Sequence, residues 1–382
     1  MNRDRLFQYM EQKEIDFLIL DSLENVSYTS GMGIPVSYGA LFAYGGGMPL
    51  AYSVVSLRDK KVTLICSNSF ENYTKYASAD QICFFENYNH FKKTDGESEL
   101  MAILQEILSS AGTGCTVGIE QKSCPALIYK MLSGFHIVDA DMALRYARKI
   151  KTPEEIARIR RSVEIEDSGQ NRLLEYSRNY QGETDFEMWS GIMLAMNEAA
   201  GKVARISGEL ALARNVEIRD GLGGPTGIKG SPGDMCRMDI SIRYHGYWCD
   251  CTNTVVMGKK PDERQTYYFQ VVEEAYEAAK ECLVPGRRLS DAAAAEAKVY
   301  KKYGMEPQVY TGHQIGCGVN EPGRIVCYEH DLIESQMVVC IEPQQYGTPG
   351  EGIGVRLEKV IEITEKGPAE LNKFMWGHKI WS

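Results

Sequence analysis

Residues 237–254 read RMDISIRYHGYWCDCTNT, and two acidic side chains, Asp239 and Asp250, stand 11 residues apart in this stretch. The tetrapeptide YHGY between them is typical of a tight turn that joins two antiparallel strands. Such a hairpin brings side chains of one face close together across the strand pair. Two carboxylates on a buried face repel each other unless a cation lies between them. The stretch therefore predicts a hairpin that binds a divalent metal ion.

Three more metal-binding residue types stand in apolar contexts further along the chain. His313 lies in TGHQIG, Glu342 ends the apolar run MVVCI before a proline, and Glu358 lies in GVRLEKVI. Each residue alone has an ordinary explanation, such as a solvated strand face or a loop hydrogen bond. A glutamate that ends such an apolar run is costly to bury without a partner, however. We therefore expect these residues to form one metal site: Asp239, Asp250, His313, Glu342 and Glu358.

The composition restricts the class of protein. A chain of 382 residues favours two domains, and 44% hydrophobic residues are ordinary for a globular protein. The formal net charge of -10 argues against a nucleic-acid partner. No apolar run is long enough to span a membrane, and the charged N-terminus lacks the apolar core of a signal peptide. We therefore expect a cytoplasmic protein with neither a nucleic-acid nor a membrane partner.

The 11 cysteines include no CxxC pair, so we expect reduced thiols that pack as small apolar residues. Cys249 and Cys251 flank Asp250 and resemble soft metal ligands. Side chains alternate along a strand, however, so in a strand over 247–256 both thiols point away from Asp250. We expect them to be structural.

The first 150 residues alternate between helical and extended patterns. A helix is expected over 3–13, and apolar residues at 100, 103, 104 and 107 predict another. Strands are expected at 17–20, 62–66, 117–120 and 136–139. This alternation indicates an α/β domain. The glycine run at 45–47 is expected to be a turn, not a nucleotide-binding loop.

A domain boundary is expected near 148–152. Thr152, Pro153 and Glu155 form the sequence pattern of a helix capping box, which predicts a long helix at the start of a second domain. Further helices are expected over 183–200 and 262–282, and another from a Ser290 cap to Gly304. Strands are expected within 204–256 and 308–364. Helices and strands in this order indicate an α+β domain, with a possible duplication.

The stretch 237–254, GHQIG at 312–316, IEP at 341–343 and RLE at 356–358 resemble the pita-bread metallohydrolases. That superfamily includes methionine aminopeptidase, Xaa-Pro aminopeptidase, prolidase and creatinase. Residues 25–31, NVSYTSG, are similar to a segment of the creatinase/prolidase branch. The resemblance implies an α+β fold: a pita-bread catalytic domain over 151–382, preceded by a smaller α/β creatinase-type domain over 1–150.

The resemblance also implies two divalent ions, which the oxygen and nitrogen ligands allow to be Mn, Co, Zn or Fe. Asp250 and Glu358 would bridge the ions, with Asp239 on one ion and His313 and Glu342 on the other. A hydroxide between the ions would attack an amide bond, and Glu342 would carry its proton to the leaving group. Arg356 would orient Glu358 and contact the substrate, and the Thr252 hydroxyl would face the site. The resemblance further implies a homodimer.

The sequence departs from the peptidases of this superfamily at three positions. The slot of one catalytic histidine, 17 or 18 residues before Asp239, falls on Gly221 or Leu222. The slot of a second histidine holds Asn320, which can donate a hydrogen bond but cannot transfer a proton. A position that often carries a positive charge holds Asn253. We therefore assign substrate contacts to Gly221, Leu222 and Asn320, and a catalytic hydrogen bond to Asn320.

Three hypotheses follow. The favoured one is a prolidase-type or aminopeptidase-P-type hydrolase that acts on a short peptide. The second is a hydrolase or lyase on the same fold that acts on a small non-peptide metabolite, as creatinase does. The third is an inactive binding protein, against which the complete ligand set argues. Three other histidines were considered as replacements for the missing ones: His90, His330 and His378.

Overall fold

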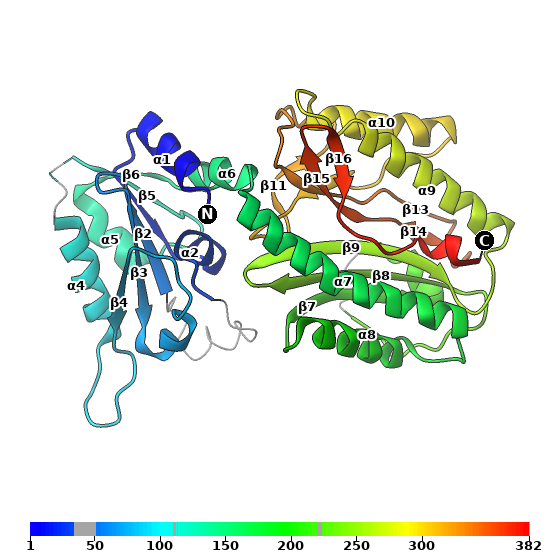
Figure 1. The fold of residues 1–382 in the computed structure, drawn as a ribbon, viewed down its shortest axis with the longest axis horizontal. Coiled ribbons are helices and arrows are strands. Elements are labelled where there is room, and N and C mark those ends of the chain that lie inside the picture. The colour runs from blue at the N-terminus through cyan, green and yellow to red at the C-terminus, as the bar shows by residue number, and fades with distance from the viewer. Residues whose placement is uncertain (34–50, 110–111, 113, 220–223, 382) are drawn as a thin grey trace. The chain divides into compact units, whose positions relative to one another are not determined.

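The computed structural model describes residues 1–33, 51–109, 112, 114–219 and 224–381. The chain folds as two compact units, Met1–Lys149 and Ile150–Ser382, each with its own sheets and helices (Figure 1). The glycine run at 45–47, for which a turn is expected, lies outside the described residues. Among the helices of the described ranges, none has both the length and the apolar character needed to cross a membrane.

The first unit is built on a mixed six-stranded sheet with the order β4-β3-β2-β1-β5-β6. Its strands are β1 (Phe17–Leu20), β2 (Ala51–Ser56), β3 (Lys61–Ser67), β4 (Gln81–Phe85), β5 (Thr116–Ile119) and β6 (His136–Asp139). Strand β1 pairs antiparallel with β2 and parallel with β5. The four strands expected from the sequence are confirmed to within a residue at each end. Strands β2 and β4 were not predicted.

Helices cover both faces of this sheet. They are α1 (Arg3–Gln12), α2 (Leu23–Ser30), α4 (Gly96–Ser109), α5 (Ala126–Met131) and α6 (Asp141–Lys149), with the short helices η1 (Asn68–Tyr73) and η2 (Leu132–Gly134). Because side chains alternate along a strand, Ile65 of β3 packs in one apolar cluster with Leu100 and Leu104 of α4. Its neighbour Leu64 packs in a second cluster with Val26 of α2. The unit is therefore α/β, as expected.

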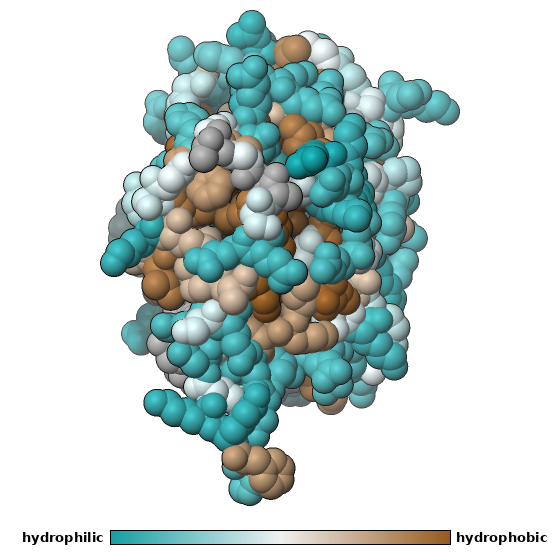
Figure 2. Space-filling view, turned by 90° about the vertical axis from the view of Figure 1, so that its left-hand side faces the viewer, coloured by the Kyte–Doolittle hydropathy of each residue, from teal (hydrophilic) through white to brown (hydrophobic). Residues whose placement is uncertain are grey.

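Apolar side chains are also exposed on the first unit. Figure 2 shows the side of the molecule that is on the left of Figure 1, and apolar residues gather in the middle of that face, among polar ones. Strand β4, which stands at one end of the sheet order, exposes Ile82 by 36% and Phe84 by 42%. An edge strand with exposed apolar side chains is a natural place for a contact with another chain.

The second unit begins with the long helix α7 (Pro153–Asn179), and the expected capping box is present. The hydroxyl of Thr152 accepts from the amide of Glu155 at 3.3 Å, and the Glu155 carboxylate accepts from the amide of Thr152 at 2.8 Å. Each bond satisfies a backbone donor that has no partner within the helix. The sequence thus sets the start of this unit locally.

The rest of the second unit repeats one order of elements: two helices and then antiparallel strands (Figure 1). The first set is α7, α8 (Asp185–Ala200), β7 (Arg205–Leu212), η3 (Ala213–Glu217), β8 (Met235–Tyr244) and β9 (Tyr247–Val256). The second set is α9 (Glu263–Glu281), α10 (Leu289–Lys302), β10 (Gly312–Gln314), β11 (Glu321–Ile325), β12 (Val338–Ile341), β13 (Gln344–Tyr346), β14 (Gly354–Arg356), β15 (Lys359–Thr364) and β16 (Gly367–Glu370), followed by η4 (Gly377–Trp381). The sheets have the orders β7-β8-β9, β11-β10-β12-β15-β16 and β13-β14. This is the expected α+β arrangement.

One predicted helix start is wrong. Ser290 was expected to cap α10, but the helix already begins at Leu289, so Ser290 lies within its first turn. The carboxylate of Asp291 accepts from the amide of Arg288 at 3.0 Å instead. A carboxylate is the stronger acceptor at a helix N-terminus because its charge also interacts favourably with the helix dipole.

Candidate metal centre

The hairpin predicted from residues 237–254 is present. Strands β8 and β9 pair antiparallel, and His245 and Gly246 form the turn with φ values of 48° and 87°. Asp239 stands opposite Thr252, and Asp250 stands opposite Ser241. The two aspartates therefore occupy diagonal positions on one face. The hydroxyl of Ser241 donates to Asp250 at 2.8 Å and fixes the orientation of that carboxylate.

The other three predicted ligands come from the second set of strands. His313 lies on β10, Glu342 directly follows β12, and Glu358 stands between β14 and β15. Two backbone bonds position the glutamates: the amide of Glu342 donates to Thr311 at 2.8 Å, and the amide of Glu358 donates to Thr252 of β9 at 2.9 Å. The second bond joins this strand set to the hairpin that carries the aspartates.

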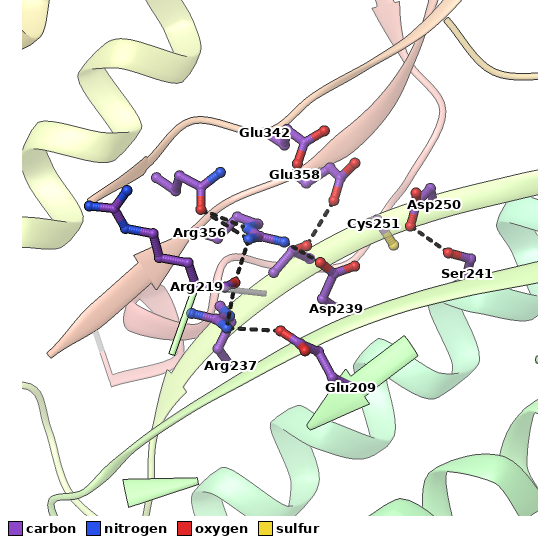
Figure 3. Close-up of polar contacts among 12 residues, drawn as sticks. Glu209, Arg219, Arg237, Asp239, Ser241, Asp250, Cys251, Glu342, Arg356 and Glu358 are labelled. Atoms are coloured by element: carbon purple, nitrogen blue, oxygen red, sulfur yellow. Dashed lines mark hydrogen bonds and ion pairs between the residues drawn. The ribbon is translucent and has the colours of Figure 1, made fainter. Parts of the chain in front are cut away.

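All five side chains meet in one place. The Nε2 atom of His313 lies 3.5 Å from Glu342, 3.7 Å from Asp250 and 3.9 Å from Glu358. Carboxylate oxygens of Asp239, Asp250 and Glu358 lie within 4.8 Å of one another. The four carboxylates surround one region in Figure 3. The structure thus brings together residues that are up to 119 positions apart, from Asp239 to Glu358.

His313 is held in the form that binds metals. Its Nδ1 atom lies 3.0 Å from the carbonyl oxygen of Gln314, to which an N–H at that position donates. The Nε2 atom, which faces the carboxylates, then carries the free lone pair. Burial lowers the pKa of His313, so the ring is neutral at physiological pH. A neutral ring with this orientation can serve as a metal ligand.

The buried carboxylates form an acidic cluster whose negative charge is not fully balanced by nearby positive side chains. Burial raises the pKa of Asp250, and the charge of Asp239 raises it further. Burial likewise raises the pKa of Glu358, with contributions from Glu342 and Asp250. The Oε2 atom of Glu358 accepts from the Thr252 hydroxyl at 2.7 Å, whereas its buried Oε1 atom accepts no hydrogen bond within the described part of the chain. This donor set fits divalent cations, which neutralise such a cluster.

Arg356 contacts a different ligand from the one expected. Its guanidinium forms an ion pair with Asp239, not the expected bond with Glu358 (Figure 3). It also donates to Gln344 and to the carbonyl of Arg219, both at 2.9 Å. Positions 356 and 358 would share one face of a continuous strand, but β14 ends at Arg356 and β15 begins only at Lys359, so this rule does not hold across Glu358. Arg356 therefore orients Asp239.

A second buried arginine, Arg237, binds the segment next to Asp239. Arg237 is fully buried and pairs with Glu209 at 2.9 Å. It donates to the carbonyl oxygens of Ile218 at 2.5 Å and of Arg219 at 3.1 Å. The carbonyl of Arg219 thus accepts from both guanidinium groups, as Figure 3 shows. The two arginines fix residues 216–219 beside Asp239.

The side chain of Asn253, the third departure noted in the sequence, points away from the candidate ligands. The residue lies on β9 between Thr252 and Thr254, and its side chain projects from the opposite face. Its amide donates to the carbonyl of Met375 at 3.1 Å and accepts from the amide of Gly377 at 3.0 Å. Asn253 therefore binds the C-terminal segment.

The expected orientation of the two cysteines is confirmed. Cys249 and Cys251 lie on the same face as Asn253 and are buried. The Cys249 thiol donates to Glu166 of α7 at 3.3 Å, and the amide of Gln170 lies 3.6 Å from the sulfur of Cys251. Their contacts join β9 to α7, on the side away from Asp250.

The assignments of substrate contacts to Asn320, Gly221 and Leu222 stay predictions. Asn320 is an exposed residue of the loop between β10 and β11, and within the described ranges it has no hydrogen bond. Gly221 and Leu222 lie outside the described residues. His330 lies 3.5 Å from Ser290 of α10, and His378 lies 3.1 Å from Glu273 of α9. These two histidines have partners away from the five ligands.

Two residues beside the centre were missed. Tyr310 lies edge-on to His313, with ring centroids 6.3 Å apart. The guanidinium of Arg324, an exposed residue of β11, lies 4.8 Å from the Tyr310 ring centre, and its charge contributes to the lowered pKa of His313. The pairing of Gly312 with Ile325 across β10 and β11 brings Arg324 here. The sequence could have predicted this position of Arg324, because residues 312–325 contain two short strands around glycines and can form a hairpin.

Comparison with known proteins places the chain in a family. The sequence profile of Metallopeptidase family M24 matches residues 157–365, which include all five candidate ligands. The chain belongs to this family. The Creatinase/Prolidase N-terminal domain profile matches residues 3–150. The resemblance to the prolidase/creatinase branch seen in the sequence is thereby confirmed, and the M24 metallopeptidase family is consistent with a metal-dependent hydrolase.

Individual relatives and structures are similar over nearly the whole chain. An Xaa-Pro dipeptidase of Pyrococcus furiosus is 25% identical over 379 residues, which cover 97% of each protein. The solved structure of an Xaa-Pro dipeptidase from Bacillus anthracis aligns with a TM-score of 0.80 at 20% identity, covering 98% of both chains. Prolidase from Pyrococcus furiosus aligns with a TM-score of 0.75 at 23% identity, covering 97% of this chain and 99% of that one. The structural matches establish the two-domain pita-bread fold.

Proposed function

We propose that this M24 family member is an Xaa-Pro dipeptidase that uses two divalent metal ions. The observation that carries the proposal is the overlap of two ligand sets. Asp239, Asp250 and Glu358 form one set, while His313 and Glu342 lie beside the same Asp250 and Glu358. Asp250 and Glu358 thus belong to both sets. Two metal ions that are bridged by carboxylates would require such shared residues. Mn, Co, Zn and Fe all suit oxygen and nitrogen ligands.

Bound ions would supply a water molecule of lowered pKa and would polarise the substrate carbonyl. The remaining chemistry belongs to the protein. Glu342 can take the proton that the attacking water loses and give it to the proline nitrogen as the C–N bond breaks. That transfer matters because an Xaa-Pro bond is a tertiary amide, whose nitrogen has no hydrogen before cleavage. Arg356, through Asp239, keeps the ligand cage in place.

The dipeptide class is supported by Arg324. A dipeptide places its terminal carboxylate only one residue from the bond that is cut. An exposed guanidinium whose charge reaches His313 is suited to that carboxylate. In a longer peptide the residue after the cleaved bond carries no free carboxylate. Arg324 therefore favours a dipeptidase over an enzyme that acts on long peptides.

Proline release tests the proposal. Protein loaded with Mn, Co, Zn or Fe is incubated with Ala-Pro and Leu-Pro, with Ala-Pro-Gly as the longer comparison and Glu342→Gln as the inactive control. We expect release from the dipeptides with at least one metal and none from the variant. No release from the dipeptides with any of the four metals would contradict the proposal.

The second candidate is a hydrolase or lyase that acts on a small non-peptide metabolite. It is favoured by the positions of His330 and His378, which contact α10 and α9 and not the ligands. A metabolite screen with metal-loaded protein separates it from the dipeptidase. An inactive binding protein is the third candidate, and metal analysis tests it because an inactive member has no need to retain metal.

We also infer that the protein acts as a homodimer in the cytoplasm. The exposed apolar side chains of edge strand β4, Ile82 and Phe84, support the contact with a second copy. The 11 cysteines are free thiols, which suits a reducing compartment. Sedimentation of the wild type and of Phe84→Glu tests the oligomer: we expect a dimer that the substitution weakens. A monomeric wild type would contradict the inference.

A further inference from the structure

The hydrogen-bond donors around the candidate centre are almost all committed to its ligands. Ser241 donates to Asp250, Thr252 donates to Glu358, and Arg356 pairs with Asp239. These groups hold the cage, so they are not available to a substrate. The hydroxyl of Tyr310 differs, because it forms no hydrogen bond with any other residue of the described ranges while its side chain is only partly buried.

Tyr310 is placed where the reaction would occur. Its ring is edge-on to His313, with ring centroids 6.3 Å apart, and the Nε2 atom of that histidine lies 3.5 Å from Glu342. Glu342 is the group to which the proposed function assigns the proton transfer. Tyr310 therefore borders the candidate ligands at His313.

The local structure holds Tyr310 in this position. The next residue, Thr311, is bound through its amide to Ile325 at 3.0 Å and through its hydroxyl to the buried Glu296. The guanidinium of Arg324 covers the Tyr310 ring from β11. A donor that is fixed before the substrate arrives needs no reorganisation during the reaction.

We propose that the Tyr310 hydroxyl donates a hydrogen bond to the carbonyl oxygen of the scissile bond as that oxygen becomes an oxyanion. This inference rests on the proposed dipeptidase function and names a catalytic residue for it. The water oxygen adds to the carbonyl carbon, and the C–N bond then breaks. The proton taken up by Glu342 passes to the proline nitrogen. Tyr310 keeps its proton throughout, since an ordinary phenol is protonated at neutral pH.

Tyr310 would thus provide what the chain lacks at its histidine slots. Asn320, the residue at one of them, is exposed and forms no hydrogen bond within the described ranges. A phenol can donate to an oxyanion as an imidazole does, although it does not shuttle protons. A tyrosine that only packs against His313 would be replaceable by phenylalanine without loss, and this separates the two roles.

The test compares Tyr310→Phe with Tyr303→Phe in the full-length, Mn-loaded protein. Tyr303 is the matched control, because its hydroxyl donates to Glu274 on a neighbouring helix, at 2.6 Å, and not to a candidate ligand. On Ala-Pro we expect kcat of Tyr310→Phe to fall by about 10- to 100-fold, as for loss of one oxyanion donor, with KM and metal content unchanged. Tyr303→Phe should match the wild type.

Binding gives a second readout that does not depend on turnover. A phosphinic analogue of Ala-Pro carries tetrahedral oxygens in place of the scissile carbonyl. Calorimetry should show that Tyr310→Phe weakens the analogue by about 10- to 100-fold, whereas the affinity for proline stays the same. Tyr310→Gln, which keeps a donor but no ring, should recover part of the loss and guards against a folding defect in the phenylalanine variant.

The outcomes distinguish the two claims. If the wild type cleaves Ala-Pro and Tyr310→Phe keeps wild-type kcat and analogue affinity, this inference is overturned and the dipeptidase function stands. If the wild type neither cleaves dipeptides nor binds the analogue, the proposed function fails and this inference fails with it. An equal loss of affinity for proline and the analogue also overturns it, since that result indicates a packing role.

Discussion

The guanidinium of Arg356 forms an ion pair with the carboxylate of Asp239, a residue 117 positions earlier in the chain. Arg356 is itself 2% exposed, so its charge depends on this carboxylate and on the carbonyl of Arg219. One buried cation thereby balances part of an otherwise acidic cluster. The same ion pair fixes the orientation of Asp239, which is the most exposed of the candidate ligands.

Removal of the Arg356 guanidinium should destabilise the metal-free protein more than the metal-bound protein. For Arg356→Gln we expect the free energy of unfolding to fall by about 2–4 kcal/mol without metal, since a buried partner is lost. Saturating Mn should restore part of that loss, because the ions then neutralise Asp239. Chemical denaturation with and without Mn measures both. Arg158→Gln, which breaks an exposed pair with Glu154 and a distant contact with the Tyr247 ring, is the control and should change little. An equal loss with and without Mn would argue against the electrostatic role.

Neighbouring residues of β9 should give opposite results because their side chains face opposite ways. Thr252→Val removes the donor to Glu358 and should weaken metal binding by about 10- to 150-fold, the value of one hydrogen bond to a charged group. Asn253→Ala removes the two bonds to the C-terminal segment and should lower stability by about 1–3 kcal/mol with unchanged metal affinity. Calorimetric titration with Mn and thermal melting separate them. A loss of metal affinity in Asn253→Ala would sink this assignment.

Arg324 should determine the need for a free carboxylate. We expect Arg324→Gln to raise KM for Ala-Pro by about 10-fold or more, the value of a lost charge-assisted bond. Hydrolysis of Ala-Pro-amide, which lacks that charge, should be nearly the same in the variant and the wild type. Steady-state kinetics on the two substrates measure this. The same KM change for both would show that Arg324 supports the fold of the site instead.

The first unit should lose stability as pH rises, through Asp21. Burial raises the pKa of Asp21 to about 7, and the nearby charge of Glu120 adds to the effect. The folded state therefore binds a proton that the unfolded state, with a pKa near 3.8, has already lost. The stabilising contribution is complete below pH about 4 and disappears as pH rises to about 7.

Asp21→Asn should remove this dependence. Its stability relative to the wild type should improve by about 2–3 kcal/mol between pH 5 and pH 8, because about two pH units of that window lie below the folded pKa of about 7, at about 1.36 kcal/mol each. Urea denaturation at the two pH values measures the difference. Asp59→Asn, at an exposed position, should follow the wild type. A variant that follows the wild-type pH profile would refute the assignment to Asp21.

The start of α7 and the hairpin of β8 and β9 could be predicted because their signals are local. A capping box acts over four residues, and strand alternation fixes the faces of Asp239, Asp250, Cys249 and Cys251. Strand β4 and the true start of α10 were missed for the opposite reason. Strand β4 contains a short apolar run, ICFF, and a run of that length does not distinguish a strand from a helix. At α10, Asp291 competes with Ser290 as a cap.

The sequence by itself indicated the class of chemistry, because five metal-binding residue types in apolar surroundings favour a metal site, and the family match agrees with that class. It also determined the α+β fold of the second unit, through periodicity and turns that act over short distances. The tertiary structure alone decided which groups serve those ligands: Arg356 on Asp239, Thr252 on Glu358, and Tyr310 with Arg324 beside His313. These contacts depend on sheet register and on the close approach of distant strands, and no local pattern in the chain encodes them.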